Sequence, residues 1–249
     1  MTVDVTLWQE TFAQDRFPPF RCPTCQKGTL ALAKDGLKVI ESGHSKLARG
    51  HEAWEPDWKE ERFSGFLACS HNTCRELVIV SGDTAIVEEE DEDYGRHWAS
   101  HLRPRSIFPA PYIIELVPEV PSGVRSELEQ SFQLFWADLN AAANRLRTSL
   151  ERALDEIGIK KYNRTGKRVS LPLATRISLF ETAYGNEFST IFTALRHVGN
   201  LGTHANVSRV ALLTTYEVYE HALGEIFGKR KKKIAALSKK LVQSKGKMK

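Results

Sequence analysis

Long apolar runs are missing from this chain of 249 residues. No stretch approaches the roughly 18 consecutive apolar residues of a transmembrane helix, so no membrane-spanning segment is predicted. The segment from Met1 to Phe12 also lacks the basic head and apolar block of a secretory signal. We therefore expect a cytoplasmic protein with no membrane partner.

Several catalytic signatures are absent as well. The chain has no GxxxxGK[ST] phosphate loop, no GxGxxG fingerprint, no serine elbow and no clear carboxylate pattern of a metal-dependent nuclease. The composition, with 41% hydrophobic and 27% charged residues, is that of a globular protein with a substantial core. These absences argue against nucleotide-driven and serine-hydrolase chemistry.

Charge is distributed unevenly along the chain. Residues 229–249 contain ten lysines and arginines and no carboxylate, and the whole chain carries +4, so residues 1–228 carry about −6 (4 − 10). This contrast indicates that the tail has a partner of its own. Phosphates of RNA or DNA are the expected partner, bound by Lys229, Arg230, Lys231, Lys232, Lys233, Lys239 and Lys240. The alternatives are anionic lipid, an acidic protein surface, the chain's own acidic run at residues 88–93, or a solubilising tail.

The four cysteines form two local pairs, Cys22 with Cys25 and Cys69 with Cys74. The spacing within each pair allows both thiolates to face one tetrahedral ion. In a reducing cytoplasm such pairs are more often metal ligands than disulfides. We therefore predict one structural zinc ion held by Cys22, Cys25, Cys69 and Cys74, with no open position for water. Four unrelated buried thiols are the alternative, and further candidate ligands are His44, His51 and His71.

Strand-like segments flank both cysteine pairs, at residues 29–32, 63–68 and 77–80. With Gly28 relieving the turn after the first pair, they predict a small zinc ribbon of short antiparallel strands. This ribbon domain spans residues 1–102 and contains a polar insertion at residues 33–62. A ribbon of this size needs its metal to stay folded.

Two segments are predicted to lie outside regular structure. The acidic run from Glu88 to Asp93 is typical of a solvated loop. The stretch 103–121 contains five prolines and cannot be helical inside, so it predicts an extended linker.

The second half of the chain is patterned for helices. Apolar residues recur at steps of three and four from Val124 to Ile157, which predicts one long amphipathic helix, or two nearly continuous ones, ended by Gly158. Further helices are predicted over residues 173–184, over 187–198, and from Asn206 or Ser208 to Phe227. Residues 122–228 are thus an α-helical domain followed by the basic tail 229–249, and the fold class is α+β, mainly α.

The most unusual stretch runs from Leu195 to His204, with the sequence LRHVGNLGTH. Gly199, Asn200 and Gly202 accept left-handed backbone angles, which predicts a sharp turn between two helices. Such a turn would bring Arg196 close to His204. An arginine fork suits a phosphate charge, and a histidine suits proton transfer. In a purely structural alternative, Arg196 pairs with a carboxylate and locks the bundle together, with Glu151, Glu181 and Glu187 as candidates.

The combination of motifs resembles a known family. The chain has a Cys-Pro-x-Cys start, a second cysteine pair, LRTSLE at residues 146–151, and the Arg196 to His204 stretch. Over about residues 8–227 this resembles the prokaryotic "domain of unknown function 4145" family, which looks related to the HEPN superfamily of helical bundles. The resemblance implies a HEPN-like bundle and a role in phage defence, toxin–antitoxin or restriction systems.

Many HEPN proteins are dimeric, metal-independent ribonucleases. The resemblance therefore implies a homodimer through the helical domain, a partner protein of a defence or restriction system, and RNA cleavage by Arg196, Asn200 and His204. Seven residues separate Arg196 from His204, a longer spacing than in the HEPN motif. We expect a zinc-binding accessory or defence protein that binds nucleic acid, with ribonuclease activity as the sharper hypothesis. The alternative is a non-enzymatic scaffold in which this stretch is structural.

Overall fold

The structure is a computed structural model that describes residues 3–91, 95–163, 169–228 and 230–245, with only the backbone at residues 91, 203, 204 and 230–233. The chain divides into two compact units. The sheet unit comprises Asp4–Tyr112 and Phe132–Asp138, and the helical unit comprises Ile113–Ser131 and the chain from Leu139 onward. The fold class is α+β, as the sequence predicted.

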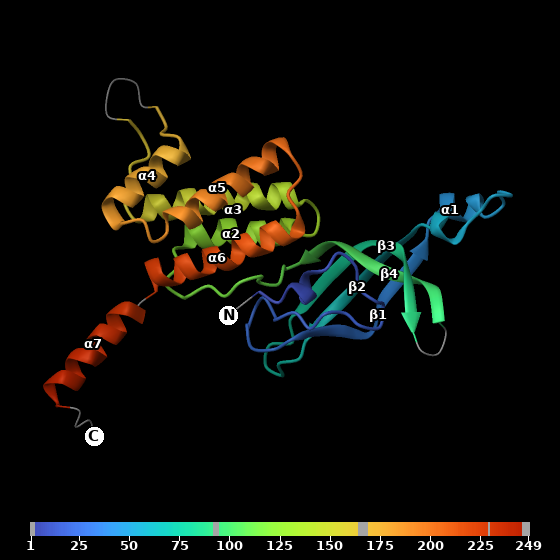
Figure 1. Cartoon of the computed structure of the whole chain (residues 1–249). Helices are drawn as coiled ribbons and strands as arrows, with labels where there is room; N and C mark the ends of the chain where they lie inside the picture. Colours follow the sequence, from blue (N-terminus) through green and yellow to red (C-terminus); the bar gives the residue numbers. More distant parts are fainter. Residues whose placement is uncertain (1–2, 92–94, 164–168, 229, 246–249) are drawn as a thin grey trace. The chain divides into compact units, whose positions relative to one another are not determined.

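Four antiparallel strands in the order β1-β2-β3-β4 form the sheet (Figure 1). The strands are β1 (Leu30–Glu41), β2 (Glu61–Cys69), β3 (Leu77–Asp91) and β4 (Gly95–Phe108). The short helix α1 (Gly43–Ala48) lies between β1 and β2. Phe12 forms an antiparallel bridge with Leu102, so the N-terminal segment lies against the edge strand β4.

One face of the sheet is buried and the other is open. Buried and exposed residues alternate strictly along β2, where Phe63 and Leu67 are buried and Phe66 is exposed. This is the period-two pattern of a half-covered strand. A cluster of aromatic rings adds to the core of this unit, with centroids 4.9–6.1 Å apart, and consists of Trp8, Phe12, Phe17, Phe20, Phe135 and Trp136.

The sheet is larger than the short-stranded ribbon that the sequence predicted. Most of β1 lies in the expected polar insertion 33–62. The acidic residues Glu88 to Asp91 continue β3 rather than forming a loop. The side chains of Glu88, Glu89 and Glu90 alternate across the ladder, and the partner strand supplies Arg96, His97 and His101. Residues 103–108, expected in the linker, end β4, because an edge strand tolerates Pro104.

Six helices belong to the helical unit: α2 (Ser122–Leu134), α3 (Leu139–Glu156), α4 (Leu173–Tyr184), α5 (Ser189–His204), α6 (Arg209–Phe227) and α7 (Arg230–Gln243). The bounds of α4 agree with the prediction, and the Ser208 side chain caps α6 by accepting a hydrogen bond from the Ala211 amide. Gly158, with φ +82°, follows the end of α3. Only the last three residues of α2 belong to the sheet unit.

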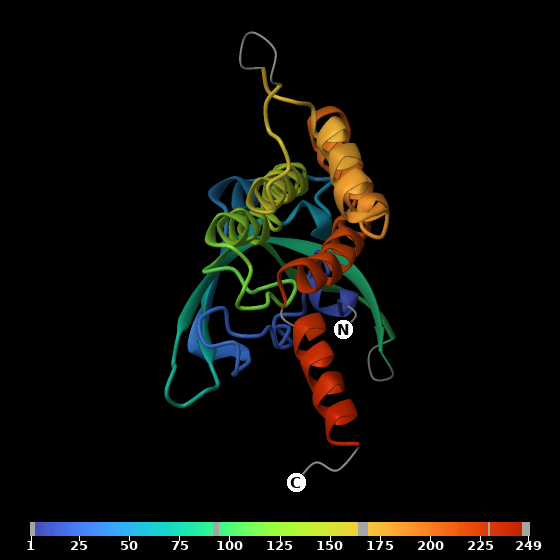
Figure 2. The same ribbon diagram turned by 90° about the vertical axis from the view of Figure 1, so that its left-hand side faces the viewer.

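Helices α2 and α3 lie side by side, not end to end (Figures 1 and 2). The Ser131 hydroxyl in α2 donates to the Ala142 carbonyl of α3 at 2.6 Å, and Glu127 pairs with Arg145 at 3.1 Å. The expectation of one long helix is therefore wrong. The alternative of two helices is correct in number, but the second reverses direction and does not continue the first. The chain reverses over residues 135–138, which contain no glycine or proline to indicate the end of a helix.

The core of the helical unit contains polar groups that bond to one another. Tyr216 and Tyr219 are fully buried, and burial raises the pKa of both phenols. Their hydroxyls bond to Ser131 and Ser149 at 2.6 and 3.3 Å. Arg176 is 2% exposed and donates to Asp155 at 2.6 Å. Among the described residues, no helix is both long and apolar enough to cross a membrane.

Candidate functional site

The four cysteine sulfurs form one cluster in the sheet unit. All four lie within 4.8 Å of one another, with 3.8 Å between Cys22 and Cys74 and 3.7 Å between Cys25 and Cys69. A tetrahedral ion with metal–sulfur bonds of about 2.3 Å requires sulfurs about 3.8 Å apart, whereas a disulfide requires about 2 Å. The cluster therefore fits a four-coordinate metal ion, and the described histidines are not part of it.

Each cysteine pair sits in a tight loop of the same form. The residue after the second cysteine has a left-handed backbone, with φ 55° at Gln26 and φ 53° at Arg75. Backbone amides point at the sulfurs, from Gly28 to Cys25 and from His71 to Cys69, both at 3.4 Å. Such amide–sulfur bonds stabilise thiolates.

Gly28 has a different role from the one that the sequence suggested. A Cβ at this position would lie 2.6 Å from the Cys69 sulfur, and φ is not positive there. The glycine makes room for the thiol of the opposite pair and does not relieve a turn.

The thiols differ in acidity. Hydrogen bonds from the amides of Gly28 and Lys27 lower the pKa of Cys25 to about 6, whereas burial raises the pKa of Cys22 and Cys69. Metal ligation requires thiolates, so Cys25 is the thiol that is ready to ligate at neutral pH.

The stretch from Leu195 to His204 is helical throughout. Helix α5 runs to His204 without interruption, so the predicted turn is wrong. The glycines serve close packing on α3 instead. A Cβ on Gly199 would lie 2.6 Å from the Arg147 Cβ, and one on Gly202 would lie 2.6 Å from the Asn140 carbonyl oxygen.

The continuous helix still brings polar groups together. Arg196 and Asn200 are four residues apart on α5 and so share a face. Arg147 of α3 donates from Nη1 to the Asn200 side-chain oxygen and from Nε to Glu151 at 3.4 Å. Sequence reasoning assigned Arg147 no role at the site, because its neighbour Asn200 is 53 residues away in the chain.

Arg196 makes none of the expected carboxylate pairs. Its Nη2 lies 3.2 Å from His197 Nε2, and its buried Nε has no hydrogen-bond partner among the described residues. The proposed lock with Glu151, Glu181 or Glu187 is therefore wrong, and Glu151 is paired with Arg147 instead.

Other predicted site residues are only partly described. His204 is the last residue of α5, and its side chain lies outside the described part. Lys239 and Lys240 are exposed on α7. Lys229 lies outside the described residues, and so do the side chains of Arg230, Lys231, Lys232 and Lys233.

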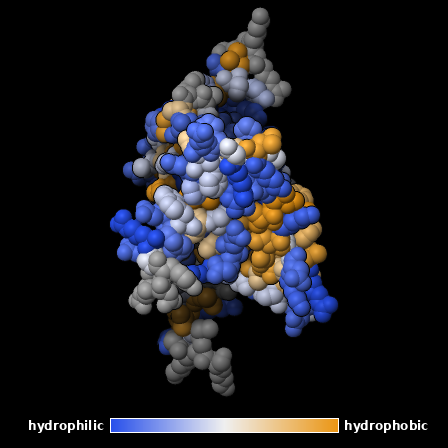
Figure 3. All heavy atoms as spheres, turned by 90° about the vertical axis from the view of Figure 1, so that its right-hand side faces the viewer, coloured by the Kyte–Doolittle hydropathy of each residue, from blue (hydrophilic) through white to orange (hydrophobic). Residues whose placement is uncertain are grey.

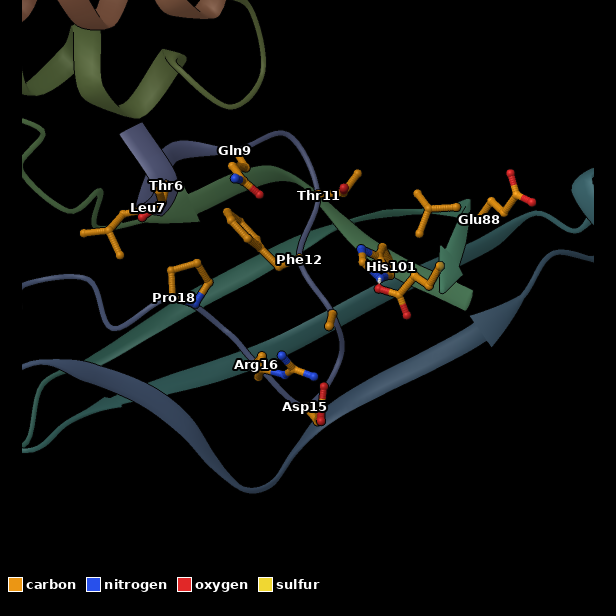
Figure 4. A pocket seen from close by; sticks show the side chains of 13 residues that line it. Thr6, Leu7, Gln9, Thr11, Phe12, Asp15, Arg16, Pro18, Glu88 and His101 are labelled. Atoms are coloured by element: carbon orange, nitrogen blue, oxygen red, sulfur yellow. Dashed lines mark hydrogen bonds and ion pairs between the residues drawn. The ribbon is translucent and has the colours of Figure 1, made fainter. Parts of the chain in front are cut away.

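A hollow of about 730 Å³ lies between the N-terminal segment and the β3–β4 hairpin of the sheet unit (Figure 4). His101 faces it and lies 2.7 Å from Glu89 through Nε2. Asp15 and Arg16 belong to its lining. Sequence reasoning missed this hollow because it treated residues 88–93 as a loop. Only the pairing of β3 with β4 places the Glu89 side chain within reach of His101.

Comparison with protein families separates the two halves of the chain. Residues 10–107 match the family described as Domain of unknown function (DUF8608), and residues 129–243 match Domain of unknown function (DUF4145). The cysteine pairs thus lie outside the region that matches the second family, although the sequence resemblance had included them. No curated protein and no solved structure gives a significant match. The helical region at residues 129–243 is therefore similar to the family described as Domain of unknown function (DUF4145).

Proposed function

We propose that the protein is a zinc-binding protein that binds nucleic acid. The concentration of cations at the C-terminal end carries this proposal. Ten lysines and arginines and no carboxylate lie in residues 229–249, and the described part of this segment forms helix α7 with exposed lysines. A dense array of cations attracts any phosphate backbone by releasing its condensed counterions.

Zinc is the metal proposed for the cysteine cluster. Four thiolates suit zinc, and a complete set of four protein ligands leaves no position for substrate water. The role of the ion is then to hold the two cysteine loops together. The bonds from Ser70 to Thr29 and from Cys22 to Gly28 align the same loops in the polypeptide.

Nucleic-acid binding is tested by charge neutralisation on α7. Lys239→Gln with Lys240→Gln should weaken binding to RNA and reduce the slope of log affinity against log salt by about two, since each phosphate contact contributes about one. The matched control is Lys34→Gln with Lys46→Gln, which removes two exposed lysines from the sheet unit. Equal effects of the two pairs, or no effect of removing residues 229–249, would show that α7 is not the binding element.

Ribonuclease activity is the second candidate function, favoured by Arg196 beside His197 and by Asn200 on the same face of α5. In this hypothesis His204 takes the proton from a ribose 2′-hydroxyl, which attacks the phosphorus. The bond to the 5′-oxygen breaks, and this oxygen takes a proton from water. Arg196 and Arg147 would stabilise the added charge on the phosphate. Asn200 would orient the phosphate.

The test is cleavage of labelled RNA with enough EDTA to remove magnesium but not the bound zinc, checked by metal analysis. Arg196→Ala and His204→Ala should each abolish cleavage at an unchanged melting temperature. If wild type does not cleave, or both variants unfold, the bonds of Arg147 to Asn200 and Glu151 are structural and a non-enzymatic interaction module is favoured. The same proposal includes a homodimer through the helical domain and a partner protein from a defence or restriction system.

A further inference from the structure

The open face of the sheet carries an apolar row that the sites above do not use. The strand register aligns Phe66, Ile79 and Phe108 across β2, β3 and β4. These side chains are 48%, 49% and 53% exposed, and Leu77, at 54%, extends the row along β3. Single exposed apolar residues are ordinary, but a contiguous group marks a binding surface. Hydrophobic residues gathered among hydrophilic ones are visible in Figure 3.

Beyond the apolar row, the same face of the sheet carries a row of hydroxyl groups and then a row of charged side chains. The next row aligns Ser64, Ser81 and Ser106, and the row after it aligns Arg62, Asp83 and Arg103. Lys38 of β1 pairs with Ser64, and Arg105 reaches Asp83 at 3.0 Å. These rows hold four cations, Lys38, Arg62, Arg103 and Arg105. Three carboxylates pair with them, namely Asp83, Glu60 at 3.7 Å from Arg62 and Glu10 at 3.9 Å from Arg103, which leaves a net charge of +1 (4 − 3).

We propose that this face of the sheet binds single-stranded nucleic acid. The rings of Phe66 and Phe108 stack on unpaired bases, and Lys38, Arg62 and Arg105 bind the backbone phosphates. The two rings lie on strands separated by one strand, about 10 Å apart. Exposed aromatic side chains beside cations are the combination that holds single strands without reading their sequence.

The neighbouring charges favour a single strand over other occupants. A protein partner would account for the apolar row but not for the cationic row beside it. A duplex would engage the cations but offers no unpaired base to the rings. The surface belongs to the sheet unit, so this proposal is independent of the binding by α7 proposed above.

The test uses the full chain and fluorescence anisotropy, with a labelled 12-nucleotide oligouridine and an RNA duplex of the same length. Phe66→Ala with Phe108→Ala should raise the Kd for the single strand by on the order of a hundredfold, since one stacked base accounts for about tenfold. Duplex affinity should stay the same. Arg62→Gln with Lys38→Gln should reduce the salt slope for the single strand by about 1.4, since each contact with a single strand contributes about 0.7.

Trp98→Ala is the matched control. Trp98 is 62% exposed on β4 but belongs to the opposite face of the ladder, where it pairs with Glu88. It should bind the single strand like wild type. An unchanged Kd in the phenylalanine double variant, or an equal loss in Trp98→Ala, would overturn the proposal. So would a double variant that changes only from dimer to monomer, because the face would then be a protein interface.

The same measurements separate this proposal from the function assigned to α7. Removal of residues 229–249 should weaken binding to both RNAs, whereas the phenylalanine variant should weaken binding to the single strand alone. A protein without the tail that still binds oligouridine through Phe66 and Phe108 supports this proposal even if α7 makes no contribution.

Discussion

The sheet unit and the helical unit are held together by different interactions. The sheet unit buries one face of a four-stranded sheet and gathers four thiols at the end of β2, while much of its other face stays open. The helical unit relies on close contact between helices, with α5 against α3 at Gly199 and Gly202 and fully buried Tyr216 and Tyr219 in α6. The sheet unit should therefore respond most to loss of metal, and the helical unit to added volume.

All five tryptophans lie in the sheet unit, at positions 8, 54, 58, 98 and 136. Tryptophan fluorescence therefore follows that unit alone. Helical circular dichroism follows mainly the other unit, because the sheet unit contains only short helical segments besides the end of α2. The two signals measure the two units separately in one sample.

The largest expected effect is that of Cys22→Ser. The variant should lose about one zinc ion per chain and much of the stability of the sheet unit, since zinc binding supplies much of the folding free energy of small metal-bound structures. The tryptophan transition in urea should move to much lower denaturant while the helical signal changes little. Metal analysis accompanies the titration, and Ser70→Ala, in the other cysteine loop and without a sulfur, is the control. A Cys22→Ser protein with its full zinc content would contradict the assignment.

The two regions also differed in how well their sequences predicted them. The cysteine cluster was predictable because ligand spacing within each loop is a local constraint, and two such loops suit one ion. The conformation of the stretch from Gly199 to Gly202 was not predictable, because glycine occurs both in sharp turns and at close contacts between helices. Only the position of Arg147 and Asn140 on α3 decides between these roles, and that position is not local in sequence.

The extents of the helices and strands were also hard to predict, because they too depend on contacts that are not local in sequence. The periodicity of α2 and α3 was predicted, but the reversal between them was not, because residues 135–138 contain no glycine or proline. Similarly, the acidic residues at the end of β3 have a sequence that is typical of a loop. They form a strand because β4 pairs with them and supplies basic partners. Local pattern identified the elements, and pairing between distant segments determined their extent.

Substitution of the packing glycines tests the helical unit. In Gly202→Ala the new methyl group meets the Asn140 backbone, which cannot move aside cheaply, so we expect a loss of about 2–3 kcal/mol in the free energy of unfolding. Gly224→Ala in α6 is the matched control, because nothing lies within 4 Å of its Cβ. It should stabilise the unit by up to about 1 kcal/mol through helix propensity. Urea titration followed by circular dichroism gives both values, and effects of the same sign would refute the packing role.

The smallest expected effect concerns the ion pairs of the sheet and depends on pH. Hydrogen bonds from Arg103, at 2.6 Å, and from Arg105 hold the pKa of Asp83 well below its usual range, although partial burial opposes this. Because the folded pKa lies below the unfolded value of about 3.9, the pair stabilises the fold fully above that pH, and the contribution is lost as pH falls further.

Asp83→Asn should thus cost the sheet unit about 1–2 kcal/mol near neutral pH, a modest value because both arginines are partly exposed. The difference between wild type and variant should shrink below about pH 4. Both proteins carry the same four cysteines, so acid release of metal affects them equally and cancels in the difference measured by tryptophan fluorescence. A difference that grows in acid would mean that Asp83 is protonated in the fold, and the cationic rows of the open face would then have no ionised carboxylate between them.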